Sequence, residues 1–371
     1  MSYLYPPLTS ALCLSPSAQV FTRKLLFWHK TIHRPLPWKG EKNPYLIWLS
    51  EIILQQTRAE QGLPYYIKFK KHFPDVKSLA EASEDEVLRL WQGLGYYTRA
   101  RNLHAAAKYI CNELHGKFPA DYESIRKLRG VGDYTAAAIA SFAFNLPYPV
   151  VDGNAFRVLS RVFGIKTPVD SAKGKQQFKA LAGKLIPKKY PALFNQAIMD
   201  FGALQCIPAN PDCGNCPFRN DCFAAKNKKA GVLPVKSKKI KPKERHFHYL
   251  VINEGNHVYL SKRTGNDIWK SLYEFPLIEA QKPLSVRHLM QTERWKEIFN
   301  GITVKSIKFS GNFKQSLSHQ KICASFYEIQ VSQSLQSKGI VRADKDFSEK
   351  FAFPGVIRLY FSNKYRYLFH Y

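Results

Sequence analysis

The chain has 371 residues, 45% of them hydrophobic and 23% charged, which is enough apolar material for two or three globular domains. This composition excludes collagen-like, low-complexity and wholly disordered chains, and no stretch approaches the roughly 20 apolar residues of a membrane span. Residues 1–20 lack the features of a secretory signal, and seven cysteines are an odd number for a disulfide framework. We therefore expect a cytoplasmic protein.

The charge of the chain is strongly positive. Lys and Arg number 56 against 28 Asp and Glu, which gives a net charge of +28. The excess is distributed as +12 over residues 1–225, +8 over 226–245 and +8 over 246–371. A polyanionic partner, most simply nucleic acid, is the natural inference, with solubility alone as the alternative.

Helical patterns dominate the first part of the chain. Residues 1–20 predict a loose, uncharged arm, and residues 21–225 predict an all-helical domain. One helix is expected to open at Asn43-Pro44, as N-cap and first-turn proline, and to run through PYLIWLSEIILQQTRAE. Further helices are expected over residues 84–91 and from Thr98, on either side of the break at GLG.

The pattern changes after a basic linker. Residues 226–245 are lysine-rich, are interrupted by Gly and Pro, and have almost nothing to bury. Residues 246–371 predict a smaller α+β domain that begins with a hairpin, HFHYLVIN and NHVYLSKR, joined at NEGN. Later runs are β-prone near 302–309 and 321–331 and helical near 284–298 and 354–361.

Four cysteines fall within seventeen residues in the pattern C-x6-C-x2-C-x5-C: Cys206, Cys213, Cys216 and Cys222. Four thiolates this close in sequence can surround one metal centre. The spacing by itself leaves both an iron–sulfur cluster and a structural zinc ion open.

The segment ESIRKLRGVGDYTAAAIASFAF predicts two helices joined by a tight turn at Gly130-Val131-Gly132. The first N–H groups of the second helix lack helical partners and form an anion site that suits a DNA phosphate. An ordinary helical hairpin is the alternative. Arg126, Lys127 and Arg129 beside the turn favour phosphate binding.

Two acidic residues stand in apolar surroundings. Glu51 is the only charge in YLIWLSEIIL, where burial would raise its pKa and keep a proton available near neutrality, as a general acid requires. The alternative is a half-exposed glutamate on a polar stripe. Asp152 follows PVV and precedes a helix, so it could be an N-cap, or the ionised partner of the acid in the cleavage of a glycosidic bond.

These motifs occur in an order that resembles the adenine DNA glycosylase family of the helix–hairpin–helix glycosylase superfamily. The resemblance is strong over residues 21–225 and weaker over 246–371. The motifs that carry it are LPW (36–38), LSEIILQQT (49–57), GLGYY (93–97), LRGVGDYTAAAI (128–139), VDGN (151–154) and the four-cysteine loop.

The resemblance implies a mainly α fold, with a two-lobed helix–hairpin–helix glycosylase domain and an iron–sulfur cluster loop, followed by a smaller α+β Nudix-like domain. It implies base excision repair of double-stranded DNA by removal of adenine mispaired with 8-oxoguanine or guanine. It also implies a [4Fe–4S] cluster on the four cysteines. We expect a monomer with no membrane partner.

The resemblance also implies roles for single residues. Glu51 matches the catalytic glutamate that protonates adenine at N7 and then helps to activate water, and Asp152 matches the aspartate that stabilises or covalently traps the sugar cation. Asn154 matches a supporting asparagine, and Tyr134 a tyrosine near the same sugar. Relatives that cut the backbone place a Schiff-base lysine at this hairpin position, so a tyrosine implies a glycosylase without strong lyase activity. Gln56 and Tyr96 match positions that fill or wedge the base stack and contact DNA, with Leu94 close by.

The second domain resembles the family's Nudix-like module through DIWKSLYEFP (267–276) and LSHQ (317–320). Ser318 and His319 match the loop that contacts the oxidised base, and Leu317 replaces a more usual aromatic residue. The clustered glutamates of a Nudix metal box are absent from the sequence, so pyrophosphate hydrolysis is not expected. Three alternatives stay open: a related glycosylase for another base such as thymine opposite guanine, a non-catalytic DNA-binding module with zinc, and a second domain that only stabilises the fold.

Overall fold

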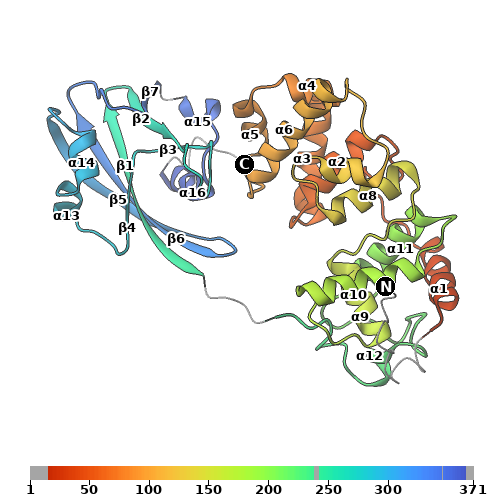
Figure 1. The fold of residues 1–371 in the computed structure, drawn as a ribbon. Helices are drawn as coiled ribbons and strands as arrows, with labels where there is room; N and C mark the ends of the chain where they lie inside the picture. The colour runs from red at the N-terminus through yellow and green to blue at the C-terminus, as the bar shows by residue number, and fades with distance from the viewer. Residues whose placement is uncertain (1–15, 238–241, 345, 365–371) are drawn as a thin grey trace, which may run out of the picture. The chain divides into compact units, whose positions relative to one another are not determined.

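The computed structural model describes residues 16–237, 242–344 and 346–364 (Figure 1). Contacts between residues divide the chain into two compact units. Unit 1 comprises Met1–Gln56, Asp75–Lys77 and Ala106–Lys238, and unit 2 comprises Thr57–Pro74, Ser78–Ala105 and Lys239–Tyr371. Part of the helical region therefore packs with the C-terminal region, although the change in composition predicted one boundary, at the linker.

Unit 1 is built from helices: α1 (Ala18–Lys30), α2 (Pro44–Leu54), the second half of α6 (Thr98–Glu113), α7 (Tyr122–Lys127), α8 (Asp133–Phe144), α9 (Gly153–Phe163), α10 (Ala172–Leu185), α11 (Pro191–Leu204) and α12 (Phe223–Lys226). One of its cores joins α1, α9, α10 and α11 around aromatic rings. Phe21 stacks on Phe218 with a centroid distance of 4.9 Å, and Trp28 meets Phe201 edge-on at 4.8 Å.

The N-terminal arm is shorter than the composition of residues 1–20 predicted. Helix α1 begins at Ala18 because Ser17 caps it, its hydroxyl accepting a hydrogen bond from the backbone N–H of Val20 at 3.3 Å. Residues 18–20 are therefore helical. Residues 1–15 of the expected arm lie outside the described residues.

Helix α2 also ends earlier than predicted. It stops at Leu54, and α3 (Ala59–His72) begins after a short turn, so QQTRAE does not continue one helix. Gln56 has a φ of 55°, which breaks the run of helical backbone conformations. Nothing in the sequence marked this turn, since no glycine or proline stands there.

Unit 2 contains α3, most of α4 (Val76–Glu81), α5 (Glu84–Trp91), the first half of α6 and the whole C-terminal region. The helices predicted over residues 84–91 and from Thr98 are confirmed as α5 and α6. Helix α5 packs against α3 through core aromatics, with Phe69 edge-on to Trp91 at a centroid distance of 5.6 Å. Ser83 caps α5 by accepting the N–H of Glu86.

The C-terminal part of unit 2 is a mixed sheet with helices, as predicted. The strands are β1 (Lys243–Glu254), β2 (His257–Lys262), β3 (Tyr273–Glu274), β4 (Leu277–Ala280), β5 (Val304–Ser316), β6 (Gln320–Val331) and β7 (Ile340–Asp344), and the helices are α13 (Val286–Met290), α14 (Glu293–Ile298), α15 (Phe347–Lys350) and α16 (Gly355–Lys364). The main path runs β3-β2-β1-β6-β5, with β1 and β6 parallel.

The hairpin predicted at NEGN is confirmed, because Glu254 of β1 pairs with His257 of β2. Strand β1 already begins at Lys243, so the last three residues of the predicted linker are strand, and α12 includes Lys226. Residues 238–241 of the linker are outside the described residues. No helix within the described ranges is long and apolar enough to cross a membrane.

Candidate active site

Glu51 lies on α2, a helix with almost every side chain buried, and it is itself only 7% exposed. This low exposure excludes the alternative interpretation, in which Glu51 is a half-exposed glutamate on a polar stripe. Burial raises the pKa of Glu51 from 4.5 to about 7, the hydrogen bond with Tyr134 lowers it, and the nearby Asp152 carboxylate raises it. A carboxyl group with this pKa is protonated in a large fraction of molecules at neutral pH, as a general acid must be.

Tyr134 is the second residue of α8, directly after the hairpin turn. The alanines of this helix are buried, and their small side chains let α8 pack closely against α2. Burial raises the pKa of Tyr134 well above its usual range, and the adjacent carboxyl groups of Glu51 and Asp152 raise it further. Tyr134 therefore stays a neutral phenol that donates to Glu51.

Asp152 is the N-cap of α9, the first of the two roles that the sequence left open. As N-cap of α9, its Oδ1 accepts the backbone N–H of Ala155 at 2.7 Å, and its Oδ2 accepts Nδ2 of Asn154 at 2.7 Å. Burial raises the pKa of Asp152, while these hydrogen bonds and the charge of Arg157 lower it. Its charge also reaches Glu51 and Tyr134, so the three groups form one electrostatic cluster.

Two residues that sequence reasoning missed hold this cluster in place. Asn195, fully buried on α11, accepts the N–H of Val150 at 3.0 Å and donates to the carbonyl of Tyr148 at 2.9 Å, which fixes the segment leading into Asp152. Arg157 donates to Oδ1 of Asn154 at 2.8 Å. Neither residue type is distinctive at its position, so the sequence held no signal for them.

Arg157 also connects Asp152 with the cysteine loop. Its Nε donates to the carbonyl of Cys206 at 2.7 Å, and its Nη2 to the carbonyl of Gly202 at 2.6 Å. Gly202 is required here, because a Cβ atom would lie 2.5 Å from Cβ of Asn154. A continuous chain of hydrogen bonds therefore runs from Asp152 through Asn154 and Arg157 to the loop.

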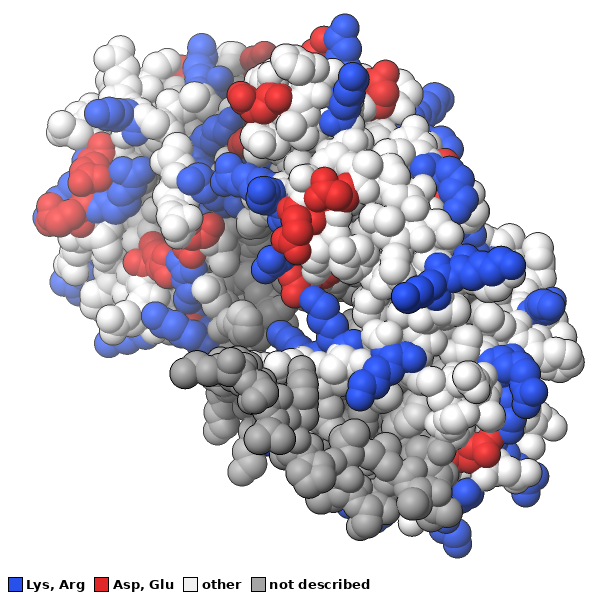
Figure 2. Space-filling view, turned by 45° about the vertical axis from the view of Figure 1, so that its right-hand side comes forward, with Lys and Arg blue, Asp and Glu red and all other residues white. Residues whose placement is uncertain are grey.

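The predicted helix–hairpin–helix is formed by α7 and α8. Gly130 has a φ of 81° and Gly132 caps α8, and both are exposed, whereas Val131 is buried beneath the turn. Arg126 Nε lies 2.6 Å from Asp133 Oδ1, so this cation is already paired. On the face shown in Figure 2, Lys and Arg side chains are dispersed over the surface and acidic side chains form smaller groups.

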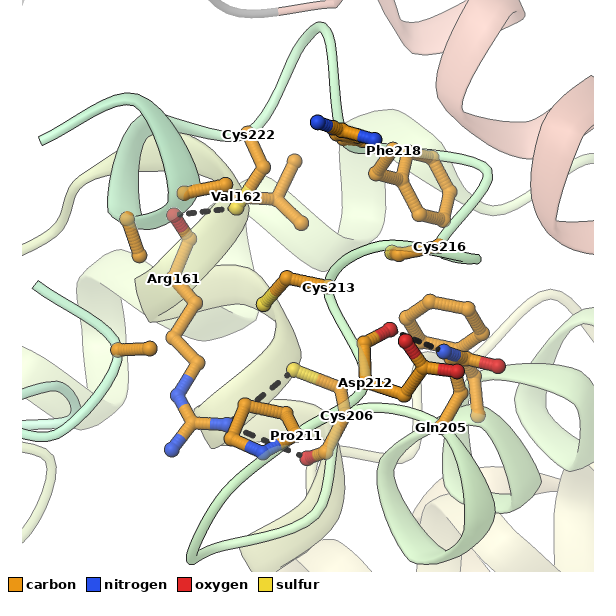
Figure 3. A pocket seen from close by; sticks show the side chains of 15 residues that line it. Arg161, Val162, Gln205, Cys206, Pro211, Asp212, Cys213, Cys216, Phe218 and Cys222 are labelled. Atoms are coloured by element: carbon orange, nitrogen blue, oxygen red, sulfur yellow. Dashed lines mark hydrogen bonds between the residues drawn. The ribbon is translucent and has the colours of Figure 1, made fainter. Parts of the chain in front are cut away.

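The four cysteines line one pocket together with Val162, Phe201 and Phe218 (Figure 3). Arg161, 2% exposed, fixes the loop: its Nη1 lies 3.4 Å from Sγ of Cys206 and 2.7 Å from the carbonyl of Ile207. Burial raises the pKa of Cys216 to about 12 and also raises that of Cys222. Among the residues that the structure describes, no three His, Cys, Asp or Glu side chains are arranged to hold a single metal ion.

The residues predicted to contact the base stack fall in different surroundings. Gln56 is exposed at the end of α2, and Leu94 is 5% exposed. Tyr96 is 49% exposed, and its hydroxyl lies 2.5 Å from Oγ of Ser318 in the turn between β5 and β6. The structure thus brings together Tyr96 and Ser318, which lie 222 residues apart in sequence. The side chain of His319 is exposed beside them in sequence.

Two family models match this chain, one in its helical region and one in its C-terminal region. Residues 49–188 match the HhH-GPD superfamily of base excision DNA repair proteins, and residues 248–363 match the NUDIX domain. The predicted combination of a helical glycosylase domain with a Nudix-like domain is confirmed.

Curated relatives show to which family of base excision repair proteins the chain belongs. The adenine DNA glycosylase of Buchnera aphidicola (subsp. Baizongia pistaciae) is 38% identical over 81% of this chain and 83% of that protein. The adenine DNA glycosylase of Mus musculus is 30% identical over 85% of this chain and 71% of that protein. This chain belongs to the adenine DNA glycosylase family, and it is an enzyme of the DNA glycosylase class.

A solved structure is also similar to this chain. The structure of a thermostable thymine-DNA glycosylase is 29% identical in sequence to this chain, with a TM-score of 0.53. The match covers 57% of this chain and 97% of the thymine-DNA glycosylase. An endonuclease III–DNA covalent intermediate has a TM-score of 0.51 at 21% identity, which shows the shared fold.

Proposed function

We propose that this chain removes adenine mispaired with 8-oxoguanine or with guanine in double-stranded DNA, by hydrolysis of the N-glycosidic bond. The observation that carries the proposal is the cluster of Glu51, Tyr134 and Asp152, in which burial gives Glu51 a pKa of about 7. The adenine specificity of the curated relatives supports the identity of the base.

The cluster can catalyse the reaction in two proton transfers. With the adenine turned out of the stack, Glu51 donates its proton to N7, and the bond between N9 and C1′ breaks with its electron pair going to the base. Adenine is a poor leaving group as an anion and a good one once protonated. The carboxylate of Glu51 then takes a proton from the water whose oxygen bonds to C1′, which restores the acid.

Asp152 and Tyr134 act on the sugar in this mechanism. The carboxylate of Asp152 stabilises the positive charge that develops at C1′, and Asn154 and the N–H of Ala155 hold it in place. Tyr134 has no amine with which to form an imine, so the chain is proposed to be monofunctional, without strong lyase activity.

The lesion-contacting surface is proposed to combine both parts of unit 2. Tyr96 would stack into the duplex and Ser318 would hydrogen-bond to the oxidised base, supported by His319. Gln56, which belongs to unit 1, is proposed separately to fill space in the stack. Leu94 would support Tyr96 from the interior. The hydrogen bond between Tyr96 and Ser318 supports this assignment. Gly130, Val131 and Gly132 would bind a phosphate through the hairpin.

Cys206, Cys213, Cys216 and Cys222 are proposed to hold a [4Fe–4S] cluster. The donor set of four thiols and no histidine fits such a cluster. The four side chains line one pocket, as a single shared group requires. The cluster would fix the fold of the loop that Arg157 and Arg161 contact.

The test is excision from a panel of duplexes. Adenine opposite 8-oxoguanine, guanine and cytosine, and thymine opposite guanine, are each incubated with the enzyme and analysed with and without alkali. We expect release of adenine opposite 8-oxoguanine and guanine, and strand breaks only after alkali. Preferential release of thymine would instead favour the function named for the similar solved structure, and breaks without alkali would contradict monofunctional action.

A further inference from the structure

The loop between α5 and α6 presents an exposed tyrosine on an unusual backbone. Gly93, Gly95 and Tyr96 have φ values of 106°, 72° and 46°. Two glycines adopt such values easily, but a tyrosine does so rarely. The ring of Tyr96 nevertheless stays 49% exposed, so it is not held by burial in a core. Such a conformation persists only where surrounding groups impose it.

The side chain of Arg99, in the first turn of α6, contacts this loop from the interior. Arg99 is 9% exposed. Its Nη2 donates to the carbonyls of Leu94 and Gly95, both at 3.3 Å. Its guanidinium lies 5.0 Å from the ring centroid of Trp91 and 5.7 Å from that of Tyr96. One flat cation therefore joins the loop carbonyls to both rings.

The same guanidinium reaches the segment that follows α2. Both Nη1 and Nη2 lie 3.4 Å from Oγ1 of Thr57. Thr57 directly follows Gln56, whose φ is 55°. Arg99 thus contacts both the loop that carries Tyr96 and Thr57 at the start of the next segment of unit 2, although it is itself too buried to reach DNA. Burial lowers its pKa to about 10, so it remains a cation at neutral pH.

We propose that Arg99 is the positioning residue for base extrusion, because it holds Tyr96 in the orientation in which the ring can enter the duplex. This inference rests on the proposed function. A lysine would keep the charge, but it has no planar group that can stack on two rings while donating to two carbonyls. Replacing Arg99 by lysine should therefore slow extrusion of the base, and the bond-breaking step at Glu51 should be unaffected.

The test compares the full-length wild type with Arg99→Lys on two substrates. One is a fully paired duplex with adenine opposite 8-oxoguanine, and the other carries the same pair inside a three-nucleotide mismatch bubble, where the adenine is already unstacked. We expect the single-turnover rate of Arg99→Lys to fall about tenfold on the paired duplex, the scale of one lost base–aromatic stack. On the bubble it should approach the wild-type rate.

A spectroscopic readout separates positioning from general structure. With 2-aminopurine at the target position, wild-type binding should increase the fluorescence as the base unstacks, and Arg99→Lys should lose most of this increase at saturating protein. Arg99→Gln provides a second variant with the same expectation. Arg89→Lys, an exposed arginine on α5, is the matched control and should behave as wild type on both substrates.

The outcomes are distinguishable. An equal loss of rate for Arg99→Lys on the paired and bubble substrates, or an unchanged 2-aminopurine signal, would overturn the positioning role while leaving the proposed function intact. A wild-type protein that releases adenine from neither substrate would overturn the proposed function itself. Rescue on the bubble with a lost fluorescence signal supports the inference.

Discussion

At the scale of single residues, the proposed chemistry depends on one proton on Glu51. We predict that Glu51→Gln keeps its affinity for a duplex with adenine opposite 8-oxoguanine, because the amide preserves the shape of the side chain. Single-turnover excision should fall by about 10²–10⁴-fold, the range for loss of a general acid. Glu113→Gln, exposed at the end of α6, is the control for a lost surface charge. Near-normal excision by Glu51→Gln would remove Glu51 from this role.

The same substitution should stabilise the protein at alkaline pH. The folded pKa of Glu51 is about 7, above its ordinary 4.5, so between these values the folded state keeps a proton that the unfolded state releases. The contribution of Glu51 to the free energy of unfolding therefore falls by at most about 3 kcal/mol as pH rises from 4.5 to 7. Above pH 7 this contribution is constant. Glu51→Gln should gain little at pH 4.5 and most of this amount at pH 8.

Urea unfolding at pH 5 and pH 8 measures this difference, with Glu113→Gln again as control. An equal shift of the unfolding midpoint at both pH values would contradict the raised pKa. The raised pKa of Glu51 follows mainly from burial, so the result also tests how far water is excluded from the site in solution.

At the scale of elements, Asp152 is the N-cap of α9, and the proposed chemistry uses the same carboxylate. Asp152→Ser replaces one good N-cap by another and removes the carboxylate. We predict that this variant loses at least about 10²-fold in excision, with a small change in unfolding temperature. Asp152→Ala should lose excision equally and in addition about 1 kcal/mol of stability. If Asp152→Ser kept wild-type excision activity, the carboxylate would have no part in catalysis.

The elements also show what a single sequence can reveal. Glu51 could be found because it stands alone in an apolar helix, and Asp152 because it precedes a helix after an apolar run. Arg99, Arg157 and Asn195 could not, because their importance comes from carbonyl groups that only the folded chain brings to them. The end of α2 was missed because the left-handed turn falls at Gln56, where no glycine or proline marks it in the sequence.

At the scale of the whole molecule, the division into units was also not visible in the sequence. The predicted boundary followed the change in composition at the linker, but residues 78–105 pack with the C-terminal region. Gln92 Oε1 accepts the backbone N–H of Phe353 at 2.7 Å, and Lys262 forms an ion pair with Asp85 at 2.6 Å. Such long-range pairs leave no local pattern, whereas strand and helix periodicity, which is local, predicted most of the elements.

The net charge of +28 makes a prediction for DNA binding by the whole chain. Many of its cations already have acidic partners: Lys24 pairs with Asp221, Arg34 and Lys39 with Asp200, Arg245 with Asp267 and Glu279, and Arg263 with Glu274. Only cations that neutralise phosphates release counterions. The salt dependence of binding therefore counts phosphate contacts, and the total charge does not enter it.

We expect about six such contacts, so that affinity for an undamaged duplex falls about 10³-fold between 50 and 200 mM salt. Fluorescence anisotropy across this range measures the slope of log affinity against log salt. Single-stranded DNA of the same length is the control and should give a shallower slope, because its charge density is lower. A flat response for the duplex would mean that the basic surface does not face DNA and that the positive charge serves solubility, the alternative that composition left open.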